Sequence, residues 1–354
     1  MGEKIKYLLK TPNEWIKATG PESEIVFSSR VRLARNMRGF SFPPWGKDSQ
    51  LKEVCNQVLE VICKSNYFKN CLILNMDELS LLEKKFLLER HLISREFIKG
   101  GRNQVLIIVP GEVVSIMVNE EDHLRIQVIL SGLQLMEAWR IADGIDTELA
   151  KNLNYAFSPQ EGYLTSCLTN VGTGLRASCM LHLPALTYIG KIDDVLKTVS
   201  KWGLVARGFY GEGSKIQGDF FQISNQVTLG LKEEEIINLV EKIVHEVIEQ
   251  EKKAREYLLK RDGLRIADEV GRAYGILSHA YLIDSGEAMS LLSKLRLGLC
   301  MGLISENIPM AVLNYLFISV GPAQIQVKEG KPLRPIMRDK IRAGVIREKL
   351  SHER

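Results

Sequence analysis

The amino-acid sequence predicts an α+β fold, a mostly antiparallel sheet flanked by helices and followed by a small α-helical domain. Apolar runs of strand length follow one another through hairpin-like connections as often as through helices, which favours antiparallel pairing. From residue 232 onward, apolar positions recur mainly with helical spacing. A chain of 354 residues is long enough for two domains, the larger with a substantial core.

The first half of the chain provides most of the expected sheet. A leader segment, residues 1–23, contains a turn at Gly20-Pro21. A hairpin is expected around Pro110-Gly111-Glu112, because two β-branched runs flank this turn sequence. The expected strands of this half are residues 25–27, 104–109, 113–118 and 125–130. The expected helices are residues 51–63, 79–91 and 133–142.

The second half begins with two strands, 203–210 and 220–229, which a Gly-rich connection joins. A long helix, 232–260, follows, and its apolar spacing fades around 249–255. We therefore expect a domain boundary there. The expected domains are residues 24–254 and 255–354. The smaller domain is expected to contain helices at residues 264–279, 286–300, 307–318 and 335–349, with a Gly/Pro/Lys loop running to Pro332.

Composition excludes several classes of function. A formal charge of +4 with scattered arginines does not indicate direct nucleic-acid binding. No apolar run approaches the ~20 residues of a membrane-spanning helix, so no membrane partner is expected. Residues 1–10 lack the apolar core of a secretory signal. The six cysteines show neither Cys-x-x-Cys pairs nor zinc-ligand spacing, so we expect reduced thiols in the cytoplasm.

An acidic cluster, Asn119-Glu120-Glu121-Asp122-His123, predicts a site that binds cations. Three consecutive carboxylates repel one another and are costly to hold together without positive charge nearby. Two carboxylates around a guanidinium could orient it, and one could accept its proton as an N–P bond forms. Glu121 and the Gly-flanked Glu212 are the candidates. The simpler alternatives are a solvated charged turn and a glutamate at a loop tip.

Five arginines in extended or turn-like settings predict an anion site. Arg30 and Arg32 lie two apart, on the same side of the backbone if the segment is extended. Arg125, Arg176 and Arg207 lie near glycines or turn residues, and planar guanidinium forks suit phosphate oxygens. Each arginine alone could equally be an ordinary surface or ion-paired residue. The glycines of residues 172–174 fit neither a P-loop nor a dinucleotide-binding motif.

Four stretches resemble the signatures of the ATP:guanido phosphotransferases (phosphagen kinases): residues 28–35, 119–125, 165–178 and 207–212. Within that family, the chain is similar to the bacterial branch that phosphorylates arginine side chains of proteins. The resemblance covers residues 24–254 as the catalytic domain and extends through the C-terminal region. It implies the guanido kinase catalytic fold, with ATP and Mg²⁺ as cofactors.

The resemblance also implies roles for individual residues. Glu121 and Glu212 would hold and activate the guanidinium, with Cys167 beside its nitrogen, and Glu120 would lie near the magnesium through water. The implied ATP-binding residues are Ser28, Ser29, Arg30, Val31, Arg32, His91, Arg125, Arg176, Ala177, Ser178, Cys179, Met180, Arg207, Gly208, Phe209, Tyr210, Gly211 and Glu212.

Three features depart from the family pattern. Leu168 follows Cys167 where the small-molecule kinases have proline, which leaves a plain buried thiol as the alternative for Cys167. Tyr210 stands where they tend to have arginine. No helical domain precedes the first motif, which fits an open site able to admit an arginine that belongs to a protein.

The last expected helix carries a second motif, Arg338-Asp339-Lys340-Ile341-Arg342-Ala343. Arg338 and Arg342 are four apart on one helical face and could hold a phosphate, while Asp339 could accept from a guanidinium. From spacing alone, a solvated basic helix is the alternative. The resemblance implies phosphoarginine binding and allosteric regulation.

The leading hypothesis is a cytoplasmic protein-arginine kinase that uses ATP and marks proteins for regulated proteolysis or stress-response control. A kinase of free arginine or another small guanidine, and a non-catalytic adaptor that binds phosphoarginine, are the alternatives. The partners that the resemblance implies are protein substrates with exposed arginines, a zinc-binding activator protein and a Clp-type ATPase or protease. An apolar-rich C-terminal domain would also suit a homodimer.

Overall fold

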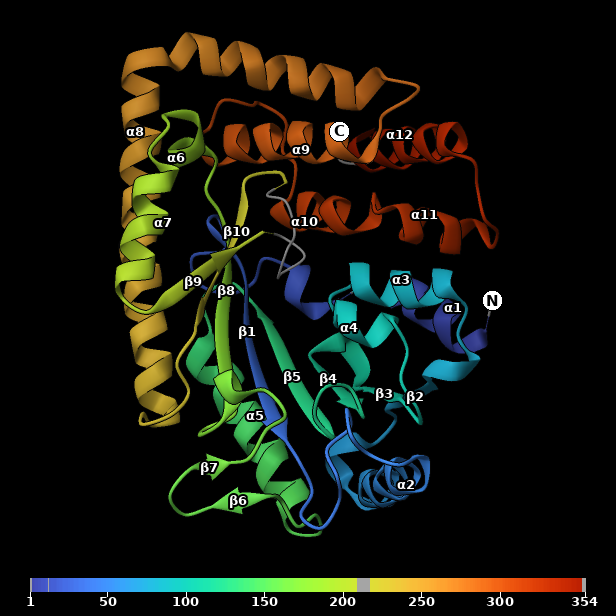
Figure 1. Ribbon diagram of the computed structural model, residues 1–354. Helices are drawn as coiled ribbons and strands as arrows, with labels where there is room; N and C mark the ends of the chain where they lie inside the picture. The colour runs from blue at the N-terminus through green and yellow to red at the C-terminus, as the bar shows by residue number, and fades with distance from the viewer. Residues whose placement is uncertain (1, 12, 209–216, 352–354) are drawn as a thin grey trace.

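One eight-stranded sheet forms the centre of the computed structural model, which describes residues 2–11, 13–208 and 217–351 (Figure 1). The strand order is β2-β3-β4-β5-β1-β8-β10-β9, and each neighbouring pair is antiparallel. The strands are β1 (Val26–Arg35), β2 (Leu72–Asn75), β3 (Val105–Ile108), β4 (Val114–Val118), β5 (Leu124–Ser131), β8 (Leu175–His182), β9 (Leu204–Arg207) and β10 (Phe220–Asn225). A separate ribbon pairs β6 (Phe157–Ser158) with β7 (Gly162–Tyr163).

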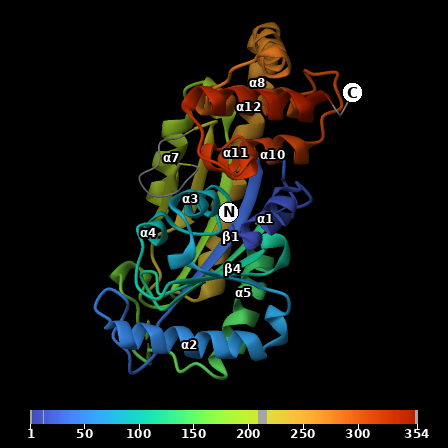
Figure 2. The same cartoon turned by 90° about the vertical axis from the view of Figure 1, so that its right-hand side faces the viewer.

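The helices surround this sheet and then continue into a helical C-terminal region. They are α1 (Glu3–Lys10), α2 (Asp48–Lys64), α3 (Leu81–Glu89), α4 (Arg95–Ile98), α5 (Leu135–Ala150), α6 (Pro184–Tyr188), α7 (Ile192–Lys201), α8 (Glu233–His279), α9 (Ser285–Cys300), α10 (Met310–Ser319), α11 (Pro322–Glu329) and α12 (Pro335–Ser351). Helices α10, α11 and α12 gather at one end of the molecule, and α2 lies at the opposite end (Figure 2). The predicted α+β fold with a helical C-terminal region is confirmed.

The two faces of the sheet differ because side chains alternate along each strand. One face carries residues such as Val31, Ile126 and Ala177, and it packs in one core cluster with α2, α5 and the first part of α8. The opposite face carries polar and charged residues in the middle of β1, β5 and β8. At one end of that face, Phe27 and Phe220 pack against the C-terminal helices in a second cluster. The polar residues in the middle of this face lie outside both of these apolar clusters.

The strands were predicted incompletely. The hairpin around Pro110 is confirmed, since β3 and β4 pair through a turn at Pro110–Glu112. Strand β1 is longer than the expected 25–27 and contains the whole arginine-rich stretch. Strands β2 and β8 were not predicted. Strand β8 does alternate, with Leu175, Ala177, Cys179 and Leu181 on the apolar face, but it contains none of the β-branched or aromatic residues that are most typical of strands.

The C-terminal helices correct another expectation. The segment expected to be a Gly/Pro/Lys loop contains helix α11, in which Pro322 is the first residue and Gly330 follows the last with φ +73°. This Pro and this Gly begin and end a helix, rather than mark a loop. Within the described ranges, no single helix has both the length and the apolar composition for crossing a membrane, although α10 and α11 meet that test as a bent pair.

The expected helices 232–260 and 264–279 are two parts of α8, which bends at Asp262 (φ −130°, ψ 24°). Its first part packs against β8 and β10, and the second crosses over the C-terminal helices (Figure 1). The apolar pattern fades near residue 251 because Glu251 and Arg255 are buried there as an ion pair, 3.0 Å apart. The domain limits 24–254 and 255–354 stay a prediction.

Candidate active site

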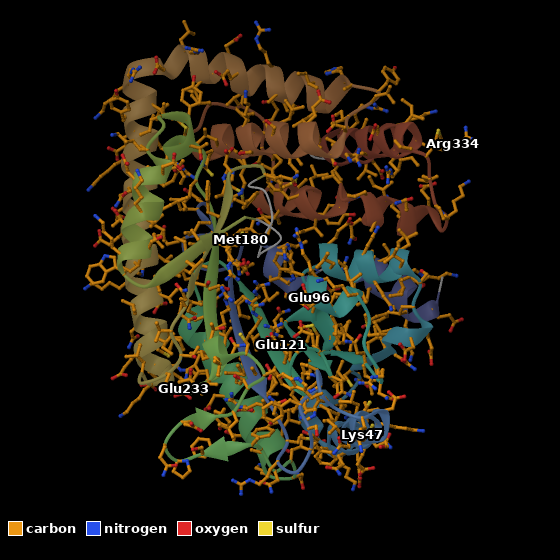
Figure 3. All side chains as sticks on the ribbon, viewed as in Figure 1. Lys47, Glu96, Glu121, Met180, Glu233 and Arg334 are labelled. Carbon is orange, nitrogen blue, oxygen red and sulfur yellow. The ribbon has the colours of Figure 1, made fainter. Side chains whose placement is uncertain are left out.

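A polar cavity of about 220 Å³ lies on the open face of the sheet. Strands β1, β5, β8, β9 and β10 form its floor, and the segment around α4 forms one wall. Glu121, at the edge of the floor, and Glu96, on the wall, both line it, and Figure 3 labels them in the middle of the molecule. The lining is rich in charge: Arg30, Arg32, Arg95, Arg125, Arg176, Arg207, Glu96, Glu120 and Glu121.

The five predicted anion-binding arginines all line this cavity. Arg30 and Arg32 lie on the same face of β1 because the segment is extended, as the spacing predicted. Arg32 lies directly opposite Arg176 of β8 in the strand register. Like charges opposite each other on neighbouring strands destabilise a sheet. This arrangement therefore favours an anion in the cavity.

The electrostatic state of Arg30 and Arg32 points the same way. Burial, with repulsion from the neighbouring arginines, lowers the pKa of Arg30 to about 9 and that of Arg32 well below its usual value. The Nε atoms of both residues are buried without a hydrogen-bond partner among the described residues. Buried donors normally have partners. A polyphosphate, with several charged acceptor oxygens, fits these donors.

Arg35, in the same strand, shows what a structurally satisfied arginine looks like. It faces away from the cavity and donates to both carboxylate oxygens of Asp146, from Nη2 (2.7 Å) and Nε (2.9 Å) to Oδ2 and from Nε (3.2 Å) to Oδ1. Its guanidinium also lies 3.5 Å from the ring centre of Tyr163. Among the described residues, Arg30 and Arg32, which face the cavity, form no such ion pair, and the charge of Glu120 compensates only part of the burial and repulsion at Arg32.

In the acidic cluster, Glu120 is bound by its neighbours. Its carboxylate accepts from Arg125 Nη1 at 2.6 and 2.7 Å and from the Ser94 hydroxyl. Burial alone would raise the pKa of Glu120, but Arg125 and these hydrogen bonds outweigh it and lower the pKa. Arg125 lines the cavity as predicted, but it also forms an ion pair with Glu120, which neutralises part of its charge.

Glu121 is the member of the cluster that faces the cavity with a half-buried carboxylate. Burial raises its pKa, and its neighbours Asp122 and Glu120 raise it further, against the opposing effect of Arg125. The Cys167 thiol is close enough to this carboxylate to lower its pKa in turn. The Cys167 sulfur also lies 3.0 Å from Thr169 Oγ1. The structure therefore brings Glu121 and Cys167 together, which their separation in sequence does not reveal.

Asp122 holds the acidic turn and the segment before Cys167 together. Its Oδ1 accepts from the Ser166 backbone N–H at 2.7 Å and from Asn36 Nδ2 at 2.6 Å. The Ser166 hydroxyl in turn donates to the carbonyl of Glu121 at 2.6 Å. The segment before Cys167 is thereby tied to the acidic turn, so Asp122 holds this segment next to Glu121, which lines the cavity.

His91 lies at the inner end of the cavity, where its backbone has a positive φ of 58°. Burial and the nearby Arg30 lower its pKa to about 3, so the ring is neutral at physiological pH. Its ring packs edge-on against Trp15, with centres 5.5 Å apart. His91 therefore adds no further positive charge to the cavity.

Not all predicted ATP-binding side chains face the cavity. The pleat turns four of them into the helical side of the sheet: Ser29, Val31, Ala177 and Cys179. Burial raises the pKa of Cys179 to about 12, so its thiol is inert. Ser28, Ser178 and Met180 line a small cavity adjoining the site, and Gly208 is buried after β9. Phe209, Tyr210, Gly211 and Glu212 lie outside the described residues.

A magnesium ion would have few ligands from the protein here. No group of three His, Cys, Asp or Glu residues suited to a metal occurs in the described ranges. Both oxygens of Glu120, the predicted neighbour of the ion, already accept hydrogen bonds. These residues fit an ion carried by phosphate oxygens and water, with at most indirect contact to Glu120.

The C-terminal motif gives Arg342 a structural role. Arg342 is 2% exposed and donates to the carbonyls of Val320 (2.8 Å) and Ile283 (2.7 Å) and to Asp339 Oδ1 (2.6 Å). Arg338 and Ile341 are partly exposed, Lys340 is exposed and Ala343 is buried. Arg342 therefore differs from the exposed phosphate-binding partner of Arg338 that helical spacing predicted, and phosphoarginine binding stays a prediction.

Several cavity residues were missed from the sequence. Ser94 caps α4 and donates to Glu120, and its place before Arg95-Glu96 is a helix-start signal. Gln127 and Gln222 line the floor. Gln127 lies two residues after Arg125, so strand alternation could have placed both on one face.

Comparison with known protein families gives two matches. Residues 53–254 match the model described as ATP:guanido phosphotransferase, C-terminal catalytic domain. Residues 263–354 match the model described as protein-arginine kinase McsB C-terminal domain.

Relatives with the same description are similar over nearly the whole chain. A protein-arginine kinase of Brevibacillus brevis is 46% identical over 348 residues, 98% of this chain and 97% of the relative. One of Pelotomaculum thermopropionicum is 47% identical over 343 residues, 96% of each.

Two solved structures share the fold. The duplicated taurocyamine kinase of Schistosoma mansoni, with bound transition-state analogue components, has a TM-score of 0.60 at 26% identity. That match covers 70% of this chain but only 35% of the duplicated enzyme. A lombricine kinase has a TM-score of 0.58 at 23% identity, over 68% of this chain and 71% of its own, and this likeness concerns the fold alone.

Proposed function

The chain belongs to the ATP:guanido phosphotransferase family, and from this membership we propose that it moves the γ-phosphate of ATP to arginine side chains of proteins. Full-length relatives at 46% and 47% identity are protein-arginine kinases, and on this similarity the chain is one as well. The proposal below concerns how its residues perform that reaction.

One observation supports the proposal most directly. Arg30 and Arg32, which have no ion-pair partner among the described residues, share a cavity with the half-buried carboxylate of Glu121. Transfer of a phosphate to a guanidinium needs an anion-binding group and a cation-binding group side by side. Catalysis would then come from alignment and from charge neutralisation of the phosphoryl group.

On the phosphate side, we assign Arg30, Arg32 and Arg176 to the phosphate oxygens of ATP. Their fixed positions on the sheet stabilise negative charge that develops during transfer, without reorganisation at that moment. Arg125 and Arg207 complete the array. Magnesium, carried by the nucleotide and water-bridged to Glu120, would neutralise further phosphate charge.

On the acceptor side, we assign Glu121 to hold the guanidinium and to accept its proton. A carboxylate with a raised pKa is the better proton acceptor, which suits this role. Cys167 would sit beside the guanidinium nitrogen. Glu212 is proposed as the second carboxylate, and it lies outside the described residues.

Further parts of the proposal concern regulation and partners. The motif from Arg338 to Ala343 would bind phosphoarginine, and a homodimer, a zinc-binding activator and a Clp-type ATPase or protease would be partners in regulated proteolysis. The six cysteines are free thiols, which is consistent with the reducing cytoplasm proposed as the location.

The test is mass spectrometry of an unfolded arginine-containing protein after reaction with ATP and Mg²⁺, under conditions that preserve N–P bonds. We expect phosphate on arginine side chains of the protein, and at least a hundredfold slower transfer by Glu121→Gln, roughly the contribution of a positioned general base. Phosphate on free arginine but never on protein would favour a small-molecule kinase instead.

A further inference from the structure

Next to the acceptor side of the cavity lies a patch of exposed apolar side chains, here called the apolar rim: Leu168, Val227, Leu229 and Leu231. Leu168 is 87% exposed and directly follows Cys167. Scattered exposed leucines are ordinary, whereas a contiguous exposed group commonly marks a binding surface. We propose that the apolar rim binds the polypeptide that carries the acceptor arginine, an inference that rests on the proposed function.

The two halves of the rim are held together by hydrogen bonds. Thr228 is 5% exposed, and its hydroxyl donates to the carbonyls of Thr169 (3.0 Å) and Val171 (2.7 Å). The side chains on either side of the buried Thr228 are exposed, Val227 at 52% and Leu229 at 55%. The exposure of these side chains therefore follows from a fixed backbone position.

Gly172 allows this close approach. Its φ is +109°, a conformation that suits glycine, and a Cβ added there would come within 2.8 Å of the Leu229 Cα atom. The Thr173 N–H also donates to the Thr228 carbonyl at 3.1 Å. The Leu229 segment thus packs directly on the turn that follows Leu168.

The rim is continuous with the acceptor side of the cavity. Ser166, which directly precedes Cys167, donates from its hydroxyl to the Glu121 carbonyl (2.6 Å) and from its N–H to Asp122 (2.7 Å). An arginine side chain has only three methylenes between its Cα and its guanidinium group. When the guanidinium is at Glu121, the backbone of its protein must pass close to Leu168.

Charge near the rim suits the same occupant. The acidic first turn of α8, with Glu233, Glu234 and Glu235, begins two residues after Leu231. Glu233 is close enough to Tyr163 to affect its pKa, and the Tyr163 N–H donates to the Gly172 carbonyl at 2.8 Å. Glu233 is labelled at the start of α8 in Figure 3. A polypeptide with apolar and basic residues around the acceptor arginine matches this surface.

The experiment compares two short blocked peptides that differ only in the residues beside a central arginine, leucine in one and glycine in the other. For the unmutated protein, we expect kcat/KM about tenfold higher with the leucine-flanked peptide, through KM, as for roughly one buried leucine contact. Leu168→Ser combined with Leu229→Ser should abolish this preference and leave kcat/KM for the glycine-flanked peptide within about twofold.

The matched control is Leu264→Ser, because Leu264 is 89% exposed on the second part of α8, past the bend at Asp262. It should keep the full preference for the leucine-flanked peptide. Leu168→Met combined with Leu229→Met should also keep most of it. Retained ATP binding in all variants would show that the cavity is intact.

Several outcomes would overturn the inference. Equal kcat/KM for the two peptides with the unmutated protein would do so, as would an unchanged preference in the Leu168/Leu229 double variant. An equal loss with both peptides would mean that the leucines act only through Glu121 and Cys167. If sedimentation showed that the double variant breaks a dimer, the rim would be an interface between copies. Absence of phosphoarginine on peptides and on unfolded protein would instead refute the proposed function.

Discussion

Arg32 and Arg35 lie three positions apart in β1 and meet opposite environments. Arg35 has a buried carboxylate partner, Asp146, whereas Arg32 faces Arg176 across the cavity floor. A buried charge without a partner costs stability, and removing one partner of a buried ion pair creates such a charge. The two residues should therefore respond in opposite directions to the same substitution.

Arg32→Met should leave the free energy of unfolding unchanged or raise it by about 1–3 kcal/mol in the absence of nucleotide, because it removes an uncompensated buried charge. Stabilisation of the protein by ATP should be lost. Arg35→Met should lower the free energy of unfolding by about 3–5 kcal/mol, because Asp146 stays buried without its partner. Urea unfolding with and without ATP measures both effects.

The contrast between these two variants is the control. If Arg32→Met destabilised the nucleotide-free protein as much as Arg35→Met, Arg32 would have a structural partner and no anion site would be needed. If Arg32→Met retained full stabilisation by ATP, the assignment of Arg32 to the phosphates would be wrong.

At the scale of elements, helix α3 is joined to helix α11 by one carboxylate. Glu89, at the end of α3, accepts from the N–H groups of Ala323 (2.9 Å) and Gln324 (2.8 Å) in the first turn of α11. The residues that follow Glu89 are Arg90, paired with Glu112, and His91 in the cavity. This junction connects the C-terminal helices to the active-site wall.

The junction should make stability depend on pH. Burial raises the pKa of Glu89 to about 7, despite the two N–H donors and the opposing charges of Arg342 and Lys85. Below about pH 4.5 the carboxyl is protonated in both the folded and the unfolded state. As pH rises to about 7, only the unfolded state ionises, so the folded state loses on the order of 3 kcal/mol.

Glu89→Gln should remove this contribution. We expect the difference in free energy of unfolding between the unmutated protein and Glu89→Gln to fall steadily from about pH 4.5 to about pH 7. Urea unfolding at several pH values measures it, and the other titrating groups cancel in the difference. A difference that does not change with pH would mean that Glu89 is already ionised at pH 5.

At the scale of the molecule, one apolar cluster crosses from the N-terminal segment through the sheet to the C-terminal helices. Aromatic rings mark the path: Trp15 to Phe27 (5.7 Å), Phe27 to Phe220 (5.1 Å) and Phe220 to Phe317 (4.8 Å). The fully buried Arg296 of α9 reinforces it. A core shared in this way couples the parts that it joins.

Arg296→Met tests this coupling. Arg296 donates to the carbonyls of Ser23 (2.7 Å) and Glu24 (2.9 Å), and it lies 2.9 Å from His182 Nδ1. Its loss leaves buried acceptors unpaired, so the free energy of unfolding should fall by about 2–4 kcal/mol. We expect a single unfolding transition before and after the change, which circular dichroism and tryptophan fluorescence should report at the same midpoint.

Arg272→Met provides the control, because Arg272 is on the surface of α8 with 74% of its side chain exposed. Its removal should change the free energy of unfolding by less than about 0.5 kcal/mol. Two separate transitions in the unmutated protein would contradict the shared core and would favour independently folding domains.

The sequence by itself determined the fold class, the cavity-facing arginines and Glu121. These follow from local rules: alternation along strands, helical spacing, and the cost of clustering like charges. The same rules missed β8, which contains no β-branched or aromatic residue, and α11, whose first residue Pro322 and following Gly330 resemble those of a loop. Spacing along a helix also does not tell which side is buried, so the burial of Arg342 could not be predicted from it.

Only the tertiary structure shows which partner each carboxylate of the acidic cluster has. Glu120 pairs with Arg125, Asp122 ties the turn to Ser166, and Glu121 is left to face the cavity. The approach of Cys167, and of the leucines beyond it, depends on hydrogen bonds between residues more than forty positions apart. Local sequence patterns carry no information on such contacts, because chain folding alone brings the segments together.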